Sequence, residues 1–296
     1  MLNNLKKIIL YPVQFIIFIL IYYILRILPD KFSSDIGGSI FKKIGPFSKS
    51  HKIILNNLEK VYKNNEKRNF KLLANDCWEN LGRTISEFSH LDKILINKNS
   101  NIRIIGEEHL KRIAEKNEQV IFIAIHQANW EILGPKICSY GIRLCSIYRH
   151  INNYFINKFI YYVRTKAYNT KELILSPKGK KSAQDMIMSI KKGFSIALLI
   201  DQKDSSGLNV PLLGQSCKTQ TAFLKLSKKF NLKIYPIQNR RLDRLRFEMI
   251  VHNPIEPMNI NDQKSEIDAM KNIHNIIEEW IKKQPESWLW QHNRWG

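Results

Sequence analysis

The chain has little cysteine and few acidic residues. Its four cysteines form no CxxC pair and lie near no histidine at a metal-ligand spacing, which is typical of reduced thiols in a cytosol-facing protein. The 296 residues carry 26 Asp and Glu against 47 Lys and Arg, a formal net charge of +21. A surface with this excess attracts anions: nucleic acid, an acidic protein, phosphorylated small molecules or an anionic bilayer.

Several other signals are absent. With 12 Gly, 10 Pro and 44% hydrophobic residues, the composition excludes a disordered, collagen-like or low-complexity chain. No HxH or HExxH motif occurs, so the sequence predicts no metal site, and no G-x-S-x-G elbow offers a serine nucleophile. No nucleic-acid-binding module is recognisable, which disfavours nucleic acid as the partner of the basic surface.

One uncharged hydrophobic run stands near the N-terminus. It extends over 18 residues from Ile8 to Leu25, and a helix of this length spans ~27 Å, about the hydrocarbon thickness of a bilayer. We therefore expect residues 1–30 to form a membrane anchor helix; a buried core helix and a helix lying in the membrane interface are the alternatives. More cations follow the run than precede it, so the positive-inside rule places the body of the protein on the cytoplasmic face.

Residues 31–296 show one α/β pattern. The continuous apolar segment 120–125 has the length and composition of a strand buried on both faces of a parallel sheet. Further strands are expected at 142–148, 172–175, 194–200, 232–239 and 244–251, the last two as a hairpin. Helical segments are expected at 30–95, 107–118, 130–140, 153–168, 179–192, 219–230 and 264–284. This alternation predicts an α/β fold: a single domain with a mostly parallel sheet covered by helices.

The segment His126-Gln-Ala-Asn-Trp-Glu131 follows directly after the strand 120–125. In open α/β sheets ligands bind at the carboxyl ends of strands, so a histidine in this place is a candidate catalytic residue. His126 in the loop and Glu131 in the first turn of the next helix can meet, with Asn129 as the N-cap. A Glu131 carboxylate that accepts one imidazole N–H leaves the other ring nitrogen as a general base. The spacing therefore predicts a His–Glu dyad that deprotonates a hydroxyl.

The HQANWE segment resembles the HxxxxE/D motif of the glycerolipid acyltransferase superfamily. Its NWE form is similar to that of the bacterial lipid A biosynthesis acyltransferase family, the late lauroyl and myristoyl transferases. Three later blocks of that family have counterparts in the same order: Tyr148-Arg149 with Asn152-Asn153 and Arg164; Asp201-Gln202 with Gly207, Val210-Pro211 and Gly214; and the ending Pro285–Trp295. The resemblance covers nearly the whole chain.

Some positions depart from the family pattern or need a separate interpretation. The departures are Gln127, Ala128, Leu212 and Leu213, which we expect to line an acyl or acceptor pocket. The tryptophans of the ending are expected to pack rather than to take part in chemistry: Trp288, Trp290 and Trp295.

The resemblance implies an O-acyltransferase. His126 would take the proton from an acceptor hydroxyl, whose oxygen attacks the thioester of an acyl carrier protein, while Glu131 orients His126. The implied acceptor is a phosphorylated glycolipid, a lipid A precursor. The implied substrate-binding residues are Asn129, Arg149, Arg164, Asp201 and Gln202. Of these, Arg149 and Arg164 would bind phosphate or developing negative charge.

The implied partners are anionic, and no cofactor is expected because the thioester already carries the activation energy. The expected location is the bacterial inner membrane, with the catalytic domain on its cytoplasmic face. The segment from Ser176 to Lys233, with 11 Lys and 3 Asp, is expected to face acyl carrier protein, the acceptor and the anionic leaflet. Two alternatives stay open: acylation of another lipid acceptor, such as a lysophospholipid or a glycosylated lipid, and a basic membrane-tethered anion-binding protein without catalysis.

Replacing His126 tests the predicted dyad. The variant His126→Ala is expected to abolish acyl transfer, because it removes the base, while the protein still folds and stays on membranes. Acyl transfer and membrane fractionation measure the two effects separately. An active His126→Ala protein would remove this histidine from the mechanism.

Overall fold

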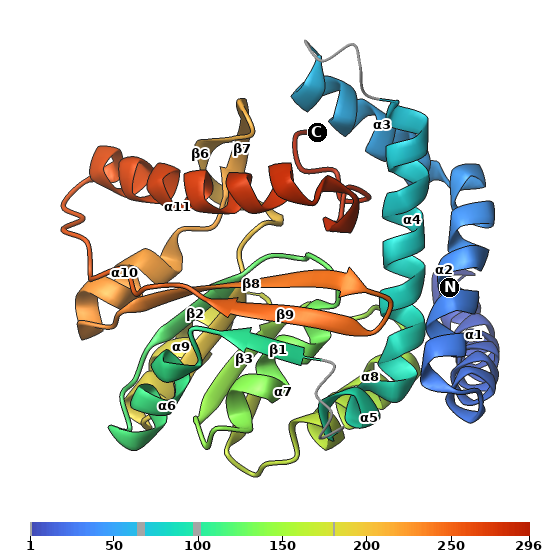
Figure 1. Cartoon of the computed structure of the whole chain (residues 1–296), viewed down its shortest axis with the longest axis horizontal. Helices are drawn as coiled ribbons and strands as arrows, with labels where there is room; N and C mark the ends of the chain where they lie inside the picture. The colour runs from blue at the N-terminus through green and yellow to red at the C-terminus, as the bar shows by residue number, and fades with distance from the viewer. Residues whose placement is uncertain (1, 64–68, 97–101, 180) are drawn as a thin grey trace.

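The centre of the structure is a seven-stranded, mostly parallel sheet with the strand order β1-β9-β8-β2-β5-β3-β4 (Figure 1). This computed structural model describes residues 2–63, 69–96, 102–179 and 181–296. Neighbouring strands of the sheet run parallel, except β8 and β9, which form an antiparallel hairpin. The strands are β1 (Ile102–Ile105), β2 (Ile121–Ala124), β3 (Leu144–Tyr148), β4 (Leu173–Pro177), β5 (Ser195–Leu199), β8 (Ile234–Asp243) and β9 (Arg246–Val251). The predicted α/β class is confirmed.

Helices cover both faces of this sheet (Figure 1). The continuous apolar run of β2 is explained by this arrangement, because Ile121 and Ile123 enter one core while Phe122 and Ala124 enter the other. The helices are α1 (Leu2–Ile27), α2 (Asp30–Ile44), α3 (Lys49–Tyr62), α4 (Phe70–Glu87), α5 (Leu91–Ile96), α6 (Glu107–Glu115), α7 (Leu133–Cys138), α8 (Tyr154–Tyr168), α9 (Ser182–Lys191), α10 (Ala222–Phe230) and α11 (Gln263–Lys283). The short 3₁₀ turns are η1 (Gly45–Phe47), η2 (Phe88–His90), η3 (Trp130–Ile132) and η4 (Pro285–Ser287).

The structure differs from the sequence-based expectation at three places. β1 was not expected, and neither was the separate two-stranded arm of β6 (Lys203–Leu212) and β7 (Gln215–Thr219). The β6 sequence KDSSGLNVPL is largely polar and lacks the regular alternation that indicates a strand. Segment 130–140 is not one helix but η3 followed by α7. Pro135 lacks the backbone N–H that a helix from Trp130 would bond to the carbonyl of Glu131.

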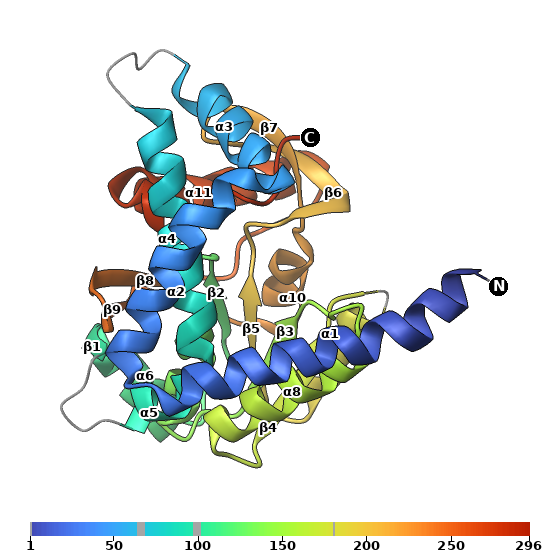
Figure 2. The same cartoon turned by 90° about the vertical axis from the view of Figure 1, so that its right-hand side faces the viewer.

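Helix α1 lies along α8 on the outside of the molecule (Figure 2). The ring centroids of Phe18 and Tyr22 lie 6.0 and 4.9 Å from that of Phe159 in α8. The other side of α1 is exposed, with Ile8 at 69% and Ile24 at 60% of full exposure. The alternative of a buried core helix is therefore wrong. By length and composition α1 can anchor the chain to a membrane.

A buried ion pair joins α4 to the hairpin. Glu87 is fully buried, and its carboxylate accepts hydrogen bonds of 2.6 and 3.1 Å from the guanidinium of Arg241 in β8. Ser34 and Asn129 donate further hydrogen bonds to the same carboxylate, at 2.7 and 2.9 Å. Since a buried charge is costly unless it is paired and hydrogen-bonded, this network ties the chain around Asn129 to α4 and β8.

Candidate functional site

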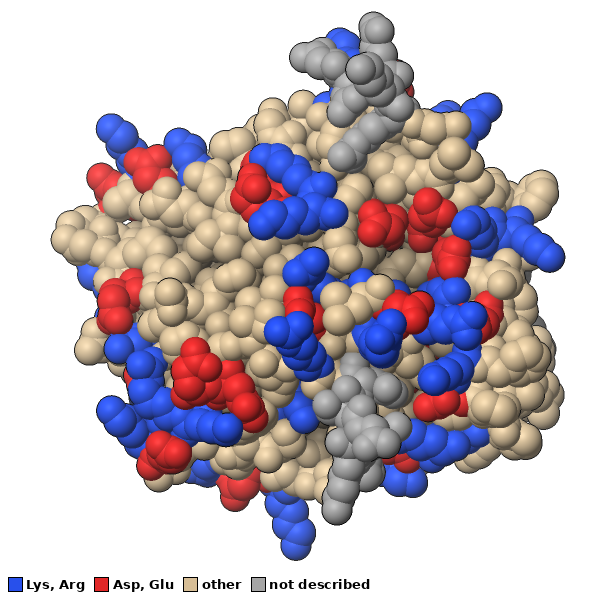
Figure 3. Space-filling view, in the orientation of Figure 1, with Lys and Arg blue, Asp and Glu red and all other residues tan. Residues whose placement is uncertain are grey.

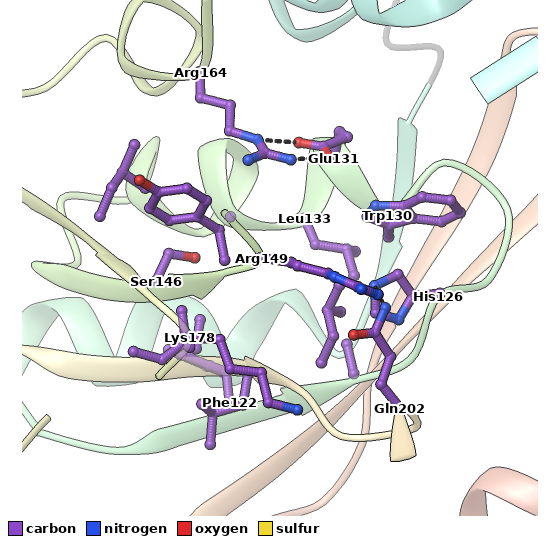
Figure 4. Close-up of a pocket in the computed structure, with 18 of the residues that line it drawn as sticks. Phe122, His126, Trp130, Glu131, Leu133, Ser146, Arg149, Arg164, Lys178 and Gln202 are labelled. Carbon is purple, nitrogen blue, oxygen red and sulfur yellow. Dashed lines mark hydrogen bonds and ion pairs between the residues drawn. The ribbon is translucent and has the colours of Figure 1, made fainter. Parts of the chain in front are cut away.

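A cavity of about 500 Å³ opens beside the carboxyl ends of β2, β3 and β5. Its lining is part polar and part apolar. The polar side chains include His126, Glu131, Arg149, Arg164, Lys178 and Gln202, and the apolar ones include Phe122, Ala124, Ile137, Leu175, Ala197 and Leu199. In Figure 4, His126, Arg149 and Gln202 gather at one end, while Phe122 and Ser146 lie toward the other. A cavity with this division suits a molecule that has a charged head and an apolar chain.

His126 is held by Asp201 and not by Glu131. Its Nδ1–H donates to Asp201 Oδ1 at 2.7 Å, and its backbone N–H donates to Asp201 Oδ2 at 3.0 Å. The two residues meet because β2 and β5 are parallel neighbours, and each residue follows the end of its strand. With Nδ1 protonated, the Nε2 lone pair faces the cavity, where the side-chain nitrogen of Gln202 lies 3.2 Å away. This arrangement gives a neutral imidazole the tautomer of a general base.

The Asp201 carboxylate is buried and ionised. It is 3% exposed, and Oδ2 accepts a second hydrogen bond from the indole N–H of Trp288 at 2.8 Å. Burial alone would raise the pKa of Asp201, but the electrostatic interaction with His126 and the hydrogen bonds from His126 and Trp288 lower it to about 2. Asp201 therefore stays negative at neutral pH and stabilises the imidazolium that forms when His126 accepts a proton.

Glu131 makes a different pair, which corrects the predicted dyad. Its carboxylate accepts hydrogen bonds of 2.9 and 2.6 Å from Nε and Nη2 of Arg164, as Figure 4 shows. Burial raises the pKa of Glu131 and the Arg164 guanidinium lowers it, with the net result below its ordinary value. Among the described residues, the hydrogen-bond partners of the His126 imidazole are Asp201 and Gln202. A bidentate guanidinium is a stronger partner for Glu131 than a single imidazole N–H, so the carboxylate turns toward α8.

Three further sequence-based assignments change. Asn129 is fully buried; it caps the η3 turn through the Glu131 backbone N–H and donates to Glu87, so it offers no surface to a substrate. Asp201 likewise contacts His126 and Trp288 rather than the cavity. Gln127 and Ala128 are fully buried beneath the turn, and with Leu212 and Leu213 they pack in the protein instead of lining the cavity. Ala128 adopts a φ of 50°, a left-handed conformation that glycine reaches at lower cost.

Of the predicted substrate-binding residues, Arg149, Arg164 and Gln202 line the cavity. The Arg164 guanidinium is already neutralised by Glu131. Arg149 is exposed, points toward the end of the cavity where His126 lies (Figure 4), and has no carboxylate partner within the described parts of the chain. The sequence did not single out Lys178, which also lines the cavity and lies 3.6 Å from Asp204. Arg149, which makes no ion pair among the described residues, and Lys178, whose Nζ makes one ion pair of 3.6 Å with Asp204 Oδ2, are thus more available to an anionic ligand than Arg164.

The apolar end of the cavity owes its space to small side chains. Ala124 in β2 and Ala197 in β5 face it from neighbouring strands, diagonal to each other across the ladder. Beyond them Tyr168 Oη donates to Ser146 Oγ at 3.0 Å. Gly134 permits this position of Tyr168, because a Cβ on Gly134 would lie 2.0 Å from Tyr168 Oη. No group of three or more metal-ligating side chains occurs within the described residues, here or elsewhere.

The Asp201 contact predicts the tautomer of His126. In Asp201→Asn, the His126 backbone N–H and the Trp288 indole N–H need an acceptor, so the amide oxygen of the new asparagine takes the place of Oδ2. Its NH₂ group then faces His126 Nδ1, which must accept a hydrogen bond. The ring proton therefore moves from Nδ1 to Nε2. Nitrogen NMR of histidine-labelled protein is expected to show an Nδ1-protonated ring in the wild type and an Nε2-protonated ring in Asp201→Asn. Glu131→Gln is the matched control and should keep the wild-type spectrum; a tautomer change in that variant alone would contradict the geometry.

Comparison with known proteins places the chain in a family. The model described as bacterial lipid A biosynthesis acyltransferase matches residues 3–296. Among solved structures, the chain is similar to the crystal structure of the 1-acyl-sn-glycerophosphate (LPA) acyltransferase PlsC from Thermotoga maritima, at 12% identity and a TM-score of 0.41, covering 84% of this chain and 99% of that chain. No curated protein matches the sequence. Because the family model spans nearly the whole chain, the protein belongs to the bacterial lipid A biosynthesis acyltransferase family.

Proposed function

We propose that this protein transfers a fatty acyl chain from an acyl carrier protein thioester to a hydroxyl of a phosphorylated glycolipid, a lipid A precursor. One observation carries the proposal. The free Nε2 of His126, backed by the buried Asp201, faces a cavity that is apolar at one end and cationic at the other. Family membership supports acyl transfer to a lipid, and the mixed polar and apolar lining of the cavity supports a lipid substrate.

The reaction needs one base and no covalent enzyme intermediate. The acceptor hydroxyl replaces the Gln202 amide at His126 Nε2 and gives its proton to that nitrogen as its oxygen attacks the thioester carbonyl carbon. Asp201 stabilises the resulting imidazolium. The tetrahedral intermediate collapses with cleavage of the carbon–sulfur bond, and the thiolate of the carrier takes the proton from His126. The products are an ester and the free carrier thiol.

The cavity divides the substrates between its ends. We place the acyl chain in the apolar end beneath Ala124 and Ala197, where it loses contact with water. The phosphate of the acceptor lies near Arg149 and Lys178, the cations without a bidentate partner. Glu131 holds the Arg164 guanidinium in the cavity wall through two hydrogen bonds, so Arg164 is not expected to bind substrate phosphate tightly.

The acceptor enters from the membrane in this proposal. Residues before α8 form part of the cavity rim, and the start of α8 continues outward with Tyr154 and Phe155, which are 60% and 42% exposed. The Phe155 ring lies with its centroid 5.8 Å from that of Phe15 in α1, and α1 runs along α8 (Figure 2). A membrane against α1 and α8 brings a lipid head group to the rim. We place the protein on the cytoplasmic face of the bacterial inner membrane, where acyl carrier protein is available.

The acidic carrier is proposed to dock at the cavity mouth. On the face shown in Figure 3, Lys and Arg lie interspersed with Asp and Glu, so this face offers no uniform attraction to an acidic protein. The mouth instead presents Arg149, His150 and Lys178 next to the position that the thioester must reach. Diffuse attraction by the lysine-rich segment 176–233 would add to the encounter rate.

An acceptor panel tests the proposal. Purified protein in detergent micelles is incubated with acyl carrier proteins that carry labelled chains, and with phosphorylated glycolipid, lysophospholipid and glycosylated lipid acceptors; mass spectrometry identifies the products. We expect an acyl ester of the phosphorylated glycolipid. A product only with another acceptor would leave acyl transfer standing and replace the substrate. No product with any acceptor, together with tight and salt-sensitive binding of anions, would favour the non-catalytic alternative.

A further inference from the structure

The C-terminal strap, residues 285–295, lies across the turn that carries His126. The backbone N–H of Ala128 donates to the carbonyl of Ser287 at 2.9 Å, and the N–H of Leu289 donates to the carbonyl of His126 at 3.0 Å. Gln127 and Trp288 thus form an antiparallel bridge between the two segments. The strap therefore holds the turn through backbone hydrogen bonds on either side of Gln127.

Trp288 extends this bridge to the catalytic carboxylate. Its indole N–H donates to Asp201 Oδ2 at 2.8 Å, next to the backbone N–H of His126 on the same oxygen. Two neutral donors on Oδ2 fix the plane of the carboxylate and leave Oδ1 for the imidazole. Trp288 itself is 3% exposed and does not line the cavity, so its side chain does not reach a ligand bound there.

The strap is itself anchored on both sides. Asn57 in α3 donates to the carbonyls of Trp290 and His292 at 3.0 and 2.9 Å. The backbone N–H of Lys203 donates to His292 Nε2 at 2.9 Å; burial lowers the pKa of His292 to about 4, which keeps this ring neutral and able to accept. These contacts fix the strap relative to the chain just beyond Asp201, so the Trp288 indole has little freedom to move.

Arg294 adds a third anchor from the end of the strap. It is 1% exposed and donates to Lys218 O and to Thr219 Oγ1, each at 2.7 Å, so it ties the strap to β7. A buried guanidinium is expensive to leave without such partners, and its two hydrogen bonds make the end of the strap a rigid part of the structure.

We propose that Trp288 is a positioning residue for acyl transfer, and that its indole N–H holds Asp201 in the plane that orients His126. The inference rests on the proposed function, but the positioning effect has a readout that needs no substrate. A tryptophan that served only packing would contribute through its ring area and not through its N–H.

Trp290 provides a matched control. It is also buried, at 0% exposure, and its indole N–H also makes one hydrogen bond, of 2.7 Å, to the carbonyl of Pro285. The two rings contact each other edge to face with centroids 4.7 Å apart. Replacement of either residue by phenylalanine therefore removes one buried N–H hydrogen bond and a similar ring area, but only Trp288 touches Asp201.

The experiment compares full-length Trp288→Phe and Trp290→Phe in detergent. We expect Trp288→Phe to lower kcat about tenfold or more with KM within about threefold of the wild type, as for loss of one hydrogen bond to a charged group. Trp290→Phe should keep kcat within about threefold while lowering the melting temperature at least as much. In an Asp201→Asn background, Trp288→Phe should have no further effect on kcat, because the carboxylate that the indole N–H orients is already absent.

A spectroscopic measurement covers the cases in which folding or turnover fails. Nitrogen and proton NMR of the His126 Nδ1–H group should change in Trp288→Phe and stay as in the wild type in Trp290→Phe. If Trp288→Phe does not fold, a variant with benzothienylalanine at position 288 takes its place in both measurements. This residue keeps the shape of the tryptophan ring but has no N–H. Wild-type protein without activity would reject the proposed function alone. An unchanged His126 signal, or equal kcat in the two tryptophan variants, would overturn the positioning role.

Discussion

The buried carboxylate of Asp201 is the contact on which the site depends. It accepts hydrogen bonds from the His126 backbone, the His126 imidazole and the Trp288 indole. These donors come from two distant parts of the chain, the end of β2 and the C-terminal strap, and Asp201 itself follows β5. A buried charge is stable only while its partners are in place, so the carboxylate couples the packing of the strap to the geometry of the base.

Three carboxylates near the turn each hold a different partner, whereas the sequence motif alone predicts that Glu131 holds the histidine. Asp201 holds the imidazole, Glu131 holds Arg164, and Glu87 holds Arg241 and the side chain of Asn129. The HxxxxE spacing therefore brings the Glu131 carboxylate to the cavity wall, where it forms an ion pair with Arg164. The partner of the histidine, Asp201, comes from the end of the neighbouring strand. This division leaves Arg149 and Lys178 as the cations open to a ligand.

Much of the fold was predictable because its signals are local. The apolar run 120–125, the hairpin of β8 and β9, and α11, which begins at the Asp262 capping box and ends before Pro285, all follow from short-range patterns. The place of His126 at the edge of the sheet was predictable because it follows a strand. Its contact with Asp201 was not predictable, because Asp201 lies 75 positions away and meets it through the pairing of β5 with β2, which no spacing in the sequence reveals. The polar β6 strand was missed because it lacks an apolar repeat.

The central claim is that Asp201, rather than Glu131, supports the base in acyl transfer. Steady-state kinetics of Asp201→Asn and Glu131→Gln with an acyl carrier protein donor test it most directly. Asp201→Asn is expected to lower kcat by roughly 10²–10⁴ with little change in KM, as expected for loss of general base catalysis. Glu131→Gln, which loosens Arg164, is expected to affect KM more than kcat. A near-normal kcat in Asp201→Asn together with a collapsed kcat in Glu131→Gln would show that Glu131, and not Asp201, supports the base.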